Sequence, residues 1–347
     1  MPINENAPLN VVPGAIRFNA DSMKLEYYRG GPVGFGTTTT TGEWVNLVTD
    51  SPDIQTGGAR GVIAGGYVSP GYVNTLDYIT ISTTGNATSF GTLTTQRGWS
   101  AGMSSSTRGV FAGGQTAPGG VYTNTIEYIT ISSTGNAASF GSLSSGVRHA
   151  PAGCSSSTRG LIGGGYIAAI TNAIDYITIA STGNTVSFGS LTQARLYISS
   201  GVNSSTRGIW GPAETAPVNT IEFVTISTLG NAIDFGDATS RAYVAGCSNS
   251  IRGLFGGGYN TNTIDYITIA TLGNSIDFGD LTRTTSGFMA SCASSTRGTW
   301  SGGTNPGTTN VIDYVTIMSI GNAIDFGDLT STRYGVTGLS NGHGGLG

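Results

Sequence analysis

Histidine and cysteine, the side chains that most often carry nucleophilic or metal chemistry, are scarce in this sequence. Two histidines, His149 and His343, and three cysteines occur among 347 residues. A Ser-His-Asp hydrolase needs a histidine beside a fixed carboxylate, and a copper-radical oxidase needs histidine and tyrosine ligands. Neither histidine has a second ligand near it in the sequence. These residue types therefore predict no metal, no cofactor and no catalytic centre.

The charged residues recur at a regular interval. An Arg-Gly pair returns with spacings of 48, 51, 48, 45 and 45 residues, at Arg60, Arg108, Arg159, Arg207, Arg252 and Arg297. A second arginine recurs at Arg97, Arg148, Arg195, Arg241, Arg283 and Arg333, and a carboxylate recurs at Asp77, Glu127, Asp175, Glu222, Asp265 and Asp313. A charge present in every copy indicates an architectural role, with a catalytic pair among the carboxylates as the alternative. Because a buried carboxylate is costly when unpaired, we expect repeat arginines or backbone amides to contact each one.

Each repeat contains four predicted strands, named a to d in the order of the blade. In the second copy, strand b begins at Arg108, strand c spans the run from Asn124 to Ile131, strand d contains Phe140, and strand a of the next copy follows Arg148. Gly135-Asn136, between c and d, is typical of a tight hairpin turn. Four strands in each copy of about 50 residues match one blade of a β-propeller. The chain is therefore predicted to be all-β.

The ends of the chain predict how the propeller closes. Strand a carries an apolar residue five positions before each later Arg-Gly pair, at Met103, Cys154, Val202, Cys247 and Cys292. Leu339 offers a sixth version, so the C-terminal strand should complete the first blade and give six blades of four antiparallel strands. The cysteines at this position are predicted to be core residues, since their spacing fits neither disulfides nor zinc. We expect an N-terminal β module at 1–58, the propeller at 59–341 and a glycine-rich tail at 342–347.

Composition limits the partners. Fifteen basic and 19 acidic residues give a formal net charge of −4, which disfavours binding to nucleic acid through a basic patch. No apolar run approaches the length of about 20 residues that spans a bilayer, and the first residues lack the features of a secretory signal. We expect a soluble chain made in a cytoplasm, without membrane insertion, and we leave assembly into a homo-oligomer open.

The two faces of the predicted propeller differ in how much they vary. Ser-Ser-Thr-Arg-Gly and Thr-Gly-Asn, in the a–b and c–d turns, barely change between copies, whereas the b–c and d–a connections on the other face change in length and sequence. Variable loops on a rigid scaffold suit recognition, although relaxed constraint would look the same. Aromatic residues there are candidates for binding sugar or protein, or else they cover the blade ends. They are Tyr67, Tyr72, Trp99, Tyr122, Tyr166, Tyr197, Tyr243, Tyr259 and Tyr334.

Two parts of the sequence resemble known families. The pairs Gly65-Gly66, Gly113-Gly114, Gly164-Gly165 and Gly257-Gly258, each followed by an aromatic strand, resemble kelch-type propeller repeats. The stretch from Pro13 to Tyr28, with Gly42-Glu43-Trp44-Val45-Asn46-Leu47, is similar to a module at the start of tail and fibre proteins of tailed bacteriophages. That resemblance implies a virion structural protein, held to other virion proteins through residues 1–58 and contacting a host surface glycan or protein.

Two other classes of function stay open. A free carbohydrate-binding lectin would use the same variable face without a particle. A polysaccharide lyase or glycosidase would need carboxylates outside the repeat pattern, and Glu214 is the only one within the predicted propeller. A glycosidase normally uses two carboxylates. Asp234, Asp277 and Asp325 belong to Asp-Phe-Gly-Asp motifs in the last three copies, which indicate a late duplication. We therefore expect a binding or structural protein and no enzyme.

Overall fold

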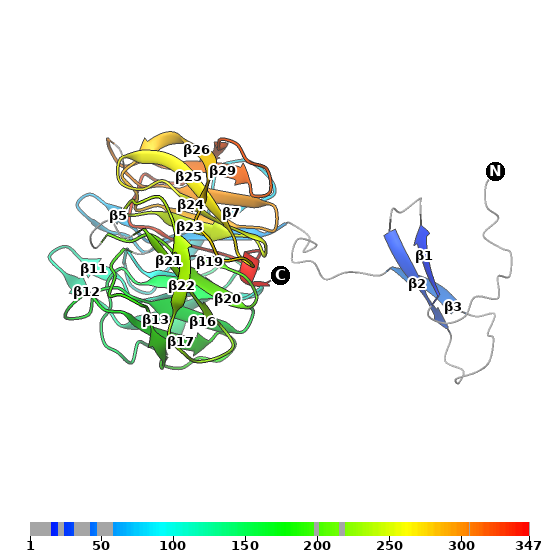
Figure 1. Cartoon of the computed structure of the whole chain (residues 1–347), viewed down its shortest axis with the longest axis horizontal. Helices are drawn as coiled ribbons and strands as arrows, with labels where there is room; N and C mark the ends of the chain where they lie inside the picture. Colours follow the sequence, from blue (N-terminus) through cyan, green and yellow to red (C-terminus); the bar gives the residue numbers. More distant parts are fainter. Residues whose placement is uncertain are drawn as a thin grey trace. The chain divides into compact units, whose positions relative to one another are not determined.

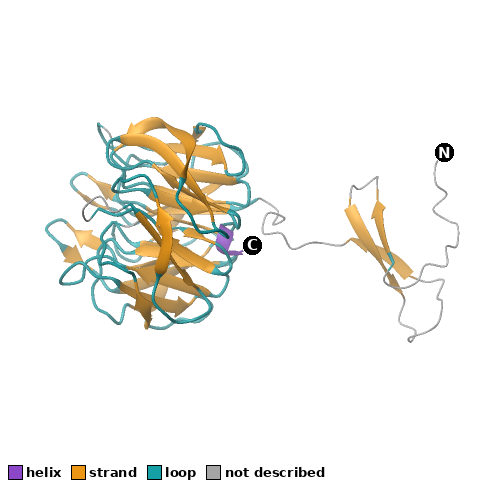
Figure 2. Ribbon diagram, viewed as in Figure 1, coloured by secondary structure: helices purple, strands orange, loops and turns teal. Residues whose placement is uncertain are grey.

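The computed structural model describes residues 15–19, 24–30, 42–46, 58–197, 201–214, 219–304 and 306–346. The chain divides into two compact units, Met1–Ser51 and Pro52–Gly347. The described elements are β-strands apart from one short 3-10 helix, η2 (Gly344–Leu346) (Figures 1 and 2). No described helix is long and apolar enough to cross a membrane.

The first unit contains a three-stranded antiparallel sheet of β1 (Ile16–Asn19), β2 (Lys24–Gly30) and β3 (Gly42–Asn46), in that order. Arg17 joins the strands, because its guanidinium lies 4.2 Å from the centre of the Trp44 ring and its Nε donates to Glu26 at 2.8 Å. Tyr28 packs edge-on against Trp44. The Trp-Val-Asn segment is thus a strand, while residues 1–14, 20–23, 31–41 and 47–57 of the expected module lie outside the described residues.

The second unit is a six-bladed β-propeller, which confirms the predicted fold. Each blade is a four-stranded antiparallel sheet in the order a, b, c, d. Blades 1 to 3 are β31 (Thr337–Ser340), β4 (Arg60–Ala64), β7 (Thr75–Thr80) and β8 (Thr88–Thr92); β9 (Ala101–Ser104), β10 (Arg108–Ala112), β13 (Thr125–Thr130) and β14 (Ala138–Ser142); and β15 (Ala152–Ser155), β16 (Arg159–Gly163), β17 (Ala173–Thr178) and β18 (Val186–Ser190). Blades 4 to 6 are β19 (Val202–Asn203), β20 (Arg207–Trp210), β21 (Thr220–Thr225) and β22 (Ile233–Asp237); β23 (Ala245–Ser248), β24 (Arg252–Gly256), β25 (Thr261–Thr268) and β26 (Ile276–Thr285); and β27 (Ala290–Ala293), β28 (Arg297–Ser301), β29 (Val311–Thr316) and β30 (Ile324–Asp328). Two small hairpins, β5 (Tyr67–Val68) with β6 (Gly71–Tyr72) and β11 (Gln115–Ala117) with β12 (Val121–Tyr122), lie in the b–c loops of blades 1 and 2.

The C-terminal strand closes the ring as the sequence predicts. In blade 1, β31 pairs with β4 so that Leu339 faces Val62, and the two strands are separated by almost the whole propeller sequence. Cys154, Cys247 and Cys292 occupy the corresponding position in β15, β23 and β27, where all three are buried and free. Burial raises the pKa of each of these thiols, so they behave as small core residues.

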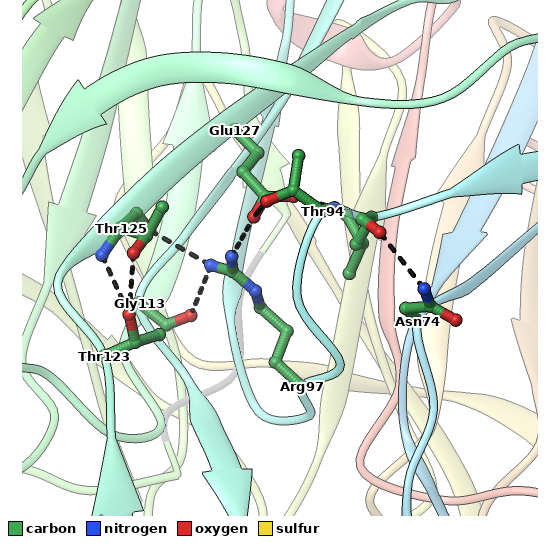
Figure 3. Close-up of polar contacts among 8 residues, drawn as sticks. Asn74, Thr94, Arg97, Gly113, Thr123, Thr125 and Glu127 are labelled. Atoms are coloured by element: carbon green, nitrogen blue, oxygen red, sulfur yellow. Dashed lines mark hydrogen bonds and ion pairs between the residues drawn. The ribbon is translucent and has the colours of Figure 1, made fainter.

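An ion pair links each blade to the next, and every member is buried except Arg283, whose side chain is 19% exposed. Arg97, in the connection that leaves blade 1, pairs with Glu127 of β13 in blade 2, and both side chains are fully buried (Figure 3). Arg97 also donates to the carbonyl oxygens of Gly113 and Thr125, at 3.2 and 3.0 Å. The other five pairs are Arg148–Asp175, Arg195–Glu222, Arg241–Asp265, Arg283–Asp313 and Arg333–Asp77, with N···O distances from 2.6 to 4.0 Å. Arg333–Asp77 joins blade 6 to blade 1.

The Arg-Gly arginines contact aromatic rings and backbone carbonyl oxygens, unlike the arginines that pair with the repeat carboxylates. Arg108 lies over the ring of Tyr128 in its own blade, 4.4 Å from its centre, and donates to the carbonyl oxygen of Ile179 in the next blade at 2.9 Å. Arg60, Arg159, Arg207, Arg252 and Arg297 repeat both contacts, the last of them reaching Ile81 of blade 1. The two arginine sets thus connect neighbouring blades at two separate levels.

The Gly-Asn segment between strands c and d is not the tight hairpin turn that the sequence suggested. Residues 131–137 connect β13 to β14, and neither Gly135 nor Asn136 adopts the left-handed conformation. Instead, the Gly135 amide donates to the carbonyl oxygen of Phe90 at 2.8 Å, and Asn136 Oδ1 accepts from the Thr92 amide at 3.1 Å. This segment of blade 2 therefore docks on strand d of blade 1.

The described part of the glycine-rich tail, residues 342–346, packs on the propeller. The six strands a contact one another around the centre of the propeller, and we call them the central strands. His343 is buried, with Nε2 lying 3.0 Å from the carbonyl oxygen of Ser104 in the central strand β9. A Cβ on Gly345 would lie 1.9 Å from the carbonyl oxygen of Ser155 in β15, so only glycine fits there. The tail therefore contacts the ends of central strands from different blades.

Candidate functional site

One residue in the connection just before each central strand has an unusual backbone conformation. Trp99, Ala150, Tyr197, Tyr243 and Phe288 have φ between 50° and 60°, and Gly335 holds the sixth position with φ 65°. Non-glycine residues are uncommon in this left-handed region and cost of order 1 kcal/mol or more there. The chain nevertheless places large aromatic side chains at four of the six positions. Backbone strain of this kind is concentrated at functional sites, so these positions define a candidate site.

The structure brings all nine aromatic candidates into one network of ring contacts, which we call the aromatic face. Trp99 is its hub, because its ring centre lies 5.5 to 6.4 Å from those of Tyr72, His149, Tyr197, Phe288 and Tyr334. Tyr67 contacts Tyr72, Tyr122 contacts His149 and Tyr166, and Tyr243 contacts Tyr197 and Tyr259. Most of these rings are half-buried, whereas Tyr72 is buried and Tyr259 is 67% exposed.

His149 and Phe288 belong to the aromatic face but were not among the candidates from sequence. His149 stacks on Tyr122 with ring centres 4.8 Å apart, and its Nε2 lies 3.4 Å from the Tyr197 hydroxyl. Burial lowers the pKa of His149 to about 4, so the imidazole is neutral near pH 7. A sequence signal existed for His149, since it directly follows a repeat arginine as Tyr334 does. Tyr243 stands two positions after Arg241, whereas Phe288 stands five positions after Arg283, so their equivalence was not visible in the sequence.

Glu214 places a carboxylate on the aromatic face. Its side chain accepts a hydrogen bond from the Tyr243 hydroxyl, and its backbone amide donates to the carbonyl oxygen of Leu196 at 3.0 Å. Burial raises the pKa of the Tyr243 hydroxyl, and the bond to Glu214 raises it further. The phenol therefore stays protonated and the carboxylate is held in place as a hydrogen-bond acceptor.

A cavity of about 90 Å³ lies between the central strands beside the aromatic face. Trp99, Tyr197, Tyr243 and Phe288 line it together with Ser100, Ser291 and Thr337. The hydroxyls of Ser100 and Thr337 are 2.9 Å apart, and Ser291 donates to the carbonyl oxygen of Gly246 at 2.6 Å. Trp99 Nε1 is buried and has no hydrogen-bond partner among the described residues. The cavity thus combines aromatic walls with hydroxyl groups.

These groups are suited to binding a ligand. Aromatic rings offer broad contact area at a low cost in conformational entropy, and the polar groups between them fix orientation. General acid–base hydrolysis of a glycoside uses two carboxyl groups across the bond, and Glu214 stands alone in this role within the described site. The repeat carboxylates, from Asp77 to Asp313, are engaged in the ion pairs between blades.

Six four-stranded blades around a central cavity, with an aromatic surface at one end, define the class of this protein as a six-bladed β-propeller. No protein-family model matches the chain, and a search of curated proteins finds no match to it.

Proposed function

We propose that this protein is a glycan-binding propeller that mediates attachment of a bacteriophage particle to its host surface, and that it binds without catalysis. The observation that carries the proposal is the aromatic face. The chain accepts strained backbone at Trp99, Tyr197, Tyr243 and Phe288, and each of these residues contributes a ring to one continuous surface. Packing alone does not require such rings, because Ala150 and Gly335 fill the same position in other blades.

Carbohydrate suits the chemistry of this face better than a charged ligand. The C–H faces of a sugar ring stack on aromatic rings, and sugar hydroxyls donate to carboxylates and accept from N–H groups. Glu214 supplies the acceptor, and the hydroxyls of Ser100 and Thr337 belong to residues that line the adjoining cavity. A neutral or N-acetylated sugar would therefore find aromatic area and polar groups in one place.

The phage assignment comes from the N-terminal unit. Residues of the segment that resembles phage tail and fibre modules form the sheet of β1, β2 and β3, held by Arg17, Glu26 and Trp44. In this proposal that unit attaches the chain to other virion proteins and the propeller faces the host. The kelch-type resemblance of the glycine pairs bears on the propeller repeats and adds nothing about the ligand.

A glycan array tests the ligand class, and labelling of purified particles tests the location. The labelled full chain should bind a subset of glycans, and Trp99→Ala should reduce binding by about tenfold or more, a loss of at least about 1.4 kcal/mol. Alanine suits this backbone, since Ala150 occupies the equivalent position. Trp44→Ala, in the N-terminal sheet, is the matched control and should bind like the parent chain.

Two results would contradict the proposal. If the parent chain binds no glycan, or binds equally well after Trp99→Ala, the aromatic face is not a sugar site. If antibodies raised against the propeller fail to label purified phage particles that encode the chain, the virion assignment is wrong even where glycan binding is found.

A further inference from the structure

Large apolar side chains stand exposed on the outer rim of blades 4, 5 and 6. Leu229, Leu272 and Ile320 lie in the c–d connections, with 59 to 61% of each residue exposed. Ile233, Ile276 and Ile324 begin strands β22, β26 and β30, with 57 to 60% exposed. We call these six residues the rim band. Side chains of this size are rarely so exposed in a group unless the surface binds something.

The docking of blade on blade places the segments that carry the rim band side by side. The segment containing Leu272 docks on β22, because Gly273 donates to the carbonyl oxygen of Phe235 at 2.9 Å. In the same way Gly321, next to Ile320, donates to the carbonyl oxygen of Phe278 in β26 at 2.9 Å. Each connection residue thus lies beside the outer strand of the preceding blade, and the apolar positions follow one another around half of the propeller.

The other three blades show that the fold does not require these side chains. At the positions of Leu229, Leu272 and Ile320, blades 1 to 3 carry Thr84, Thr134 and Thr182. At the positions of Ile233, Ile276 and Ile324 they carry Thr88, Ala138 and Val186. The pairing of strands c and d at these positions is the same in both halves, since Tyr128 faces Ala138 as Tyr266 faces Ile276 and Tyr314 faces Ile324. The propeller therefore folds equally well with smaller side chains, such as threonine, at the positions of the exposed leucines and isoleucines.

Acidic side chains accompany the rim band in the same three blades. Asp234, Asp277 and Asp325 follow the isoleucines directly, are exposed, and make no salt bridge within the described part of the chain. Serine holds their positions in blades 1 to 3, at Ser89, Ser139 and Ser187. A second copy presenting the same band would bring like charges together, which is unfavourable. A partner with lysine or arginine beside an apolar patch complements both features.

We propose that the rim band is a docking surface for a protein partner whose apolar patch is flanked by basic residues. The surface is separate from the aromatic face and does not depend on the proposed glycan binding. It occupies half of the rim, so the partner contacts one side of the propeller. At the equivalent positions of blades 1 to 3, Val186, 54% exposed, is the one large apolar side chain.

A short amphipathic helical peptide of leucine and lysine serves as the probe, and its affinity for the full chain is measured by fluorescence anisotropy at low and high salt. The triple variant Leu229→Thr, Leu272→Thr and Ile320→Thr should bind the peptide about tenfold or more weakly, through lost apolar burial. The variant Asp234→Ser, Asp277→Ser and Asp325→Ser should bind more weakly and lose most of the salt dependence. Both variants use residues that the chain already carries at equivalent positions, so they should fold.

The matched control places leucine on the other half of the rim, as Thr84→Leu, Thr134→Leu and Thr182→Leu. It should bind the peptide no more tightly than the parent chain, because blades 1 to 3 lack the aspartates. Equal binding by the parent chain and the threonine variant would overturn the proposal. So would concentration-dependent dimerisation that the threonine variant abolishes, since that result assigns the rim band to a second copy. Glycan binding should be unchanged in every variant.

Discussion

At the scale of single residues, the repeat charges act as links between blades. Glu127 is fully buried and holds Arg97, and its carboxylate also accepts from the Thr94 amide at 2.9 Å. Burial lowers the pKa of Arg97, and the charge of Glu127 opposes that shift. Two charges buried together are tolerable because each satisfies the other, whereas one charge left alone is costly.

Removing one member of this pair should therefore cost more than removing both. We expect Glu127→Leu to lower the free energy of unfolding by about 3–5 kcal/mol, because it leaves the Arg97 guanidinium buried without its carboxylate. The double variant Arg97→Met with Glu127→Leu should recover part of that loss. Urea unfolding followed by tryptophan fluorescence measures both, with the exposed neighbour variant Gln96→Ala as control. A double variant less stable than Glu127→Leu would show that the pair itself stabilises the fold.

At the scale of the element, glycines in strand d allow the next blade to dock. A Cβ on Gly141 of β14 would lie 2.1 Å from the carbonyl oxygen of Gly183, in the c–d connection of blade 3. Gly183 itself faces open space, with no atom within 4 Å of the position of its Cβ. The two glycines are thus neighbours across one blade interface with opposite steric demands.

This pair provides a matched test of blade docking. Gly141→Ala should lower stability by about 1–3 kcal/mol, because the added methyl group must push the neighbouring backbone away. Gly183→Ala should leave stability unchanged within about 0.5 kcal/mol, as for a surface substitution. Thermal unfolding by circular dichroism compares the two. Equal effects would mean that the blades shift apart at no cost and that the contact does not determine docking.

At the scale of the whole molecule, the chain consists of two units with separate cores. Arg17, Tyr28 and Trp44 pack within the first unit, and the second is closed on itself by the pairing of β31 with β4. Ring closure pairs the edge of blade 1 that would otherwise be open. The propeller should therefore not need the N-terminal sheet in order to fold.

We expect a chain lacking residues 1–51 to unfold at the same temperature as the propeller in the full chain. If the proposed function holds, the shortened chain should keep glycan binding and lose incorporation into phage particles. Differential scanning calorimetry and labelling of particles measure the two properties independently. A large fall in the unfolding temperature would show that the first unit stabilises the propeller, contrary to our expectation.

The sequence by itself determined the number of blades, the closing strand and the architectural role of the charges. Each of these follows from repetition, since a residue type that recurs in every copy meets the same local environment six times. Leu339 supplied the sixth strand a, so the number of blades could be counted from the sequence. The sequence also identified Tyr67, Trp99 and Tyr243 as lying on one face, because they fall in the connections of that face.

Only the tertiary structure decided which partners meet. It paired each carboxylate with the arginine of the preceding connection, it docked Gly135-Asn136 on the neighbouring blade, and it placed His343 against the central strands. It also added His149 and Phe288 to the aromatic face and revealed the left-handed backbone at the residues that bear four of its rings. These contacts join residues of different blades, so they depend on how the blades are arranged around the ring. The pattern of residues within one repeat does not encode that arrangement.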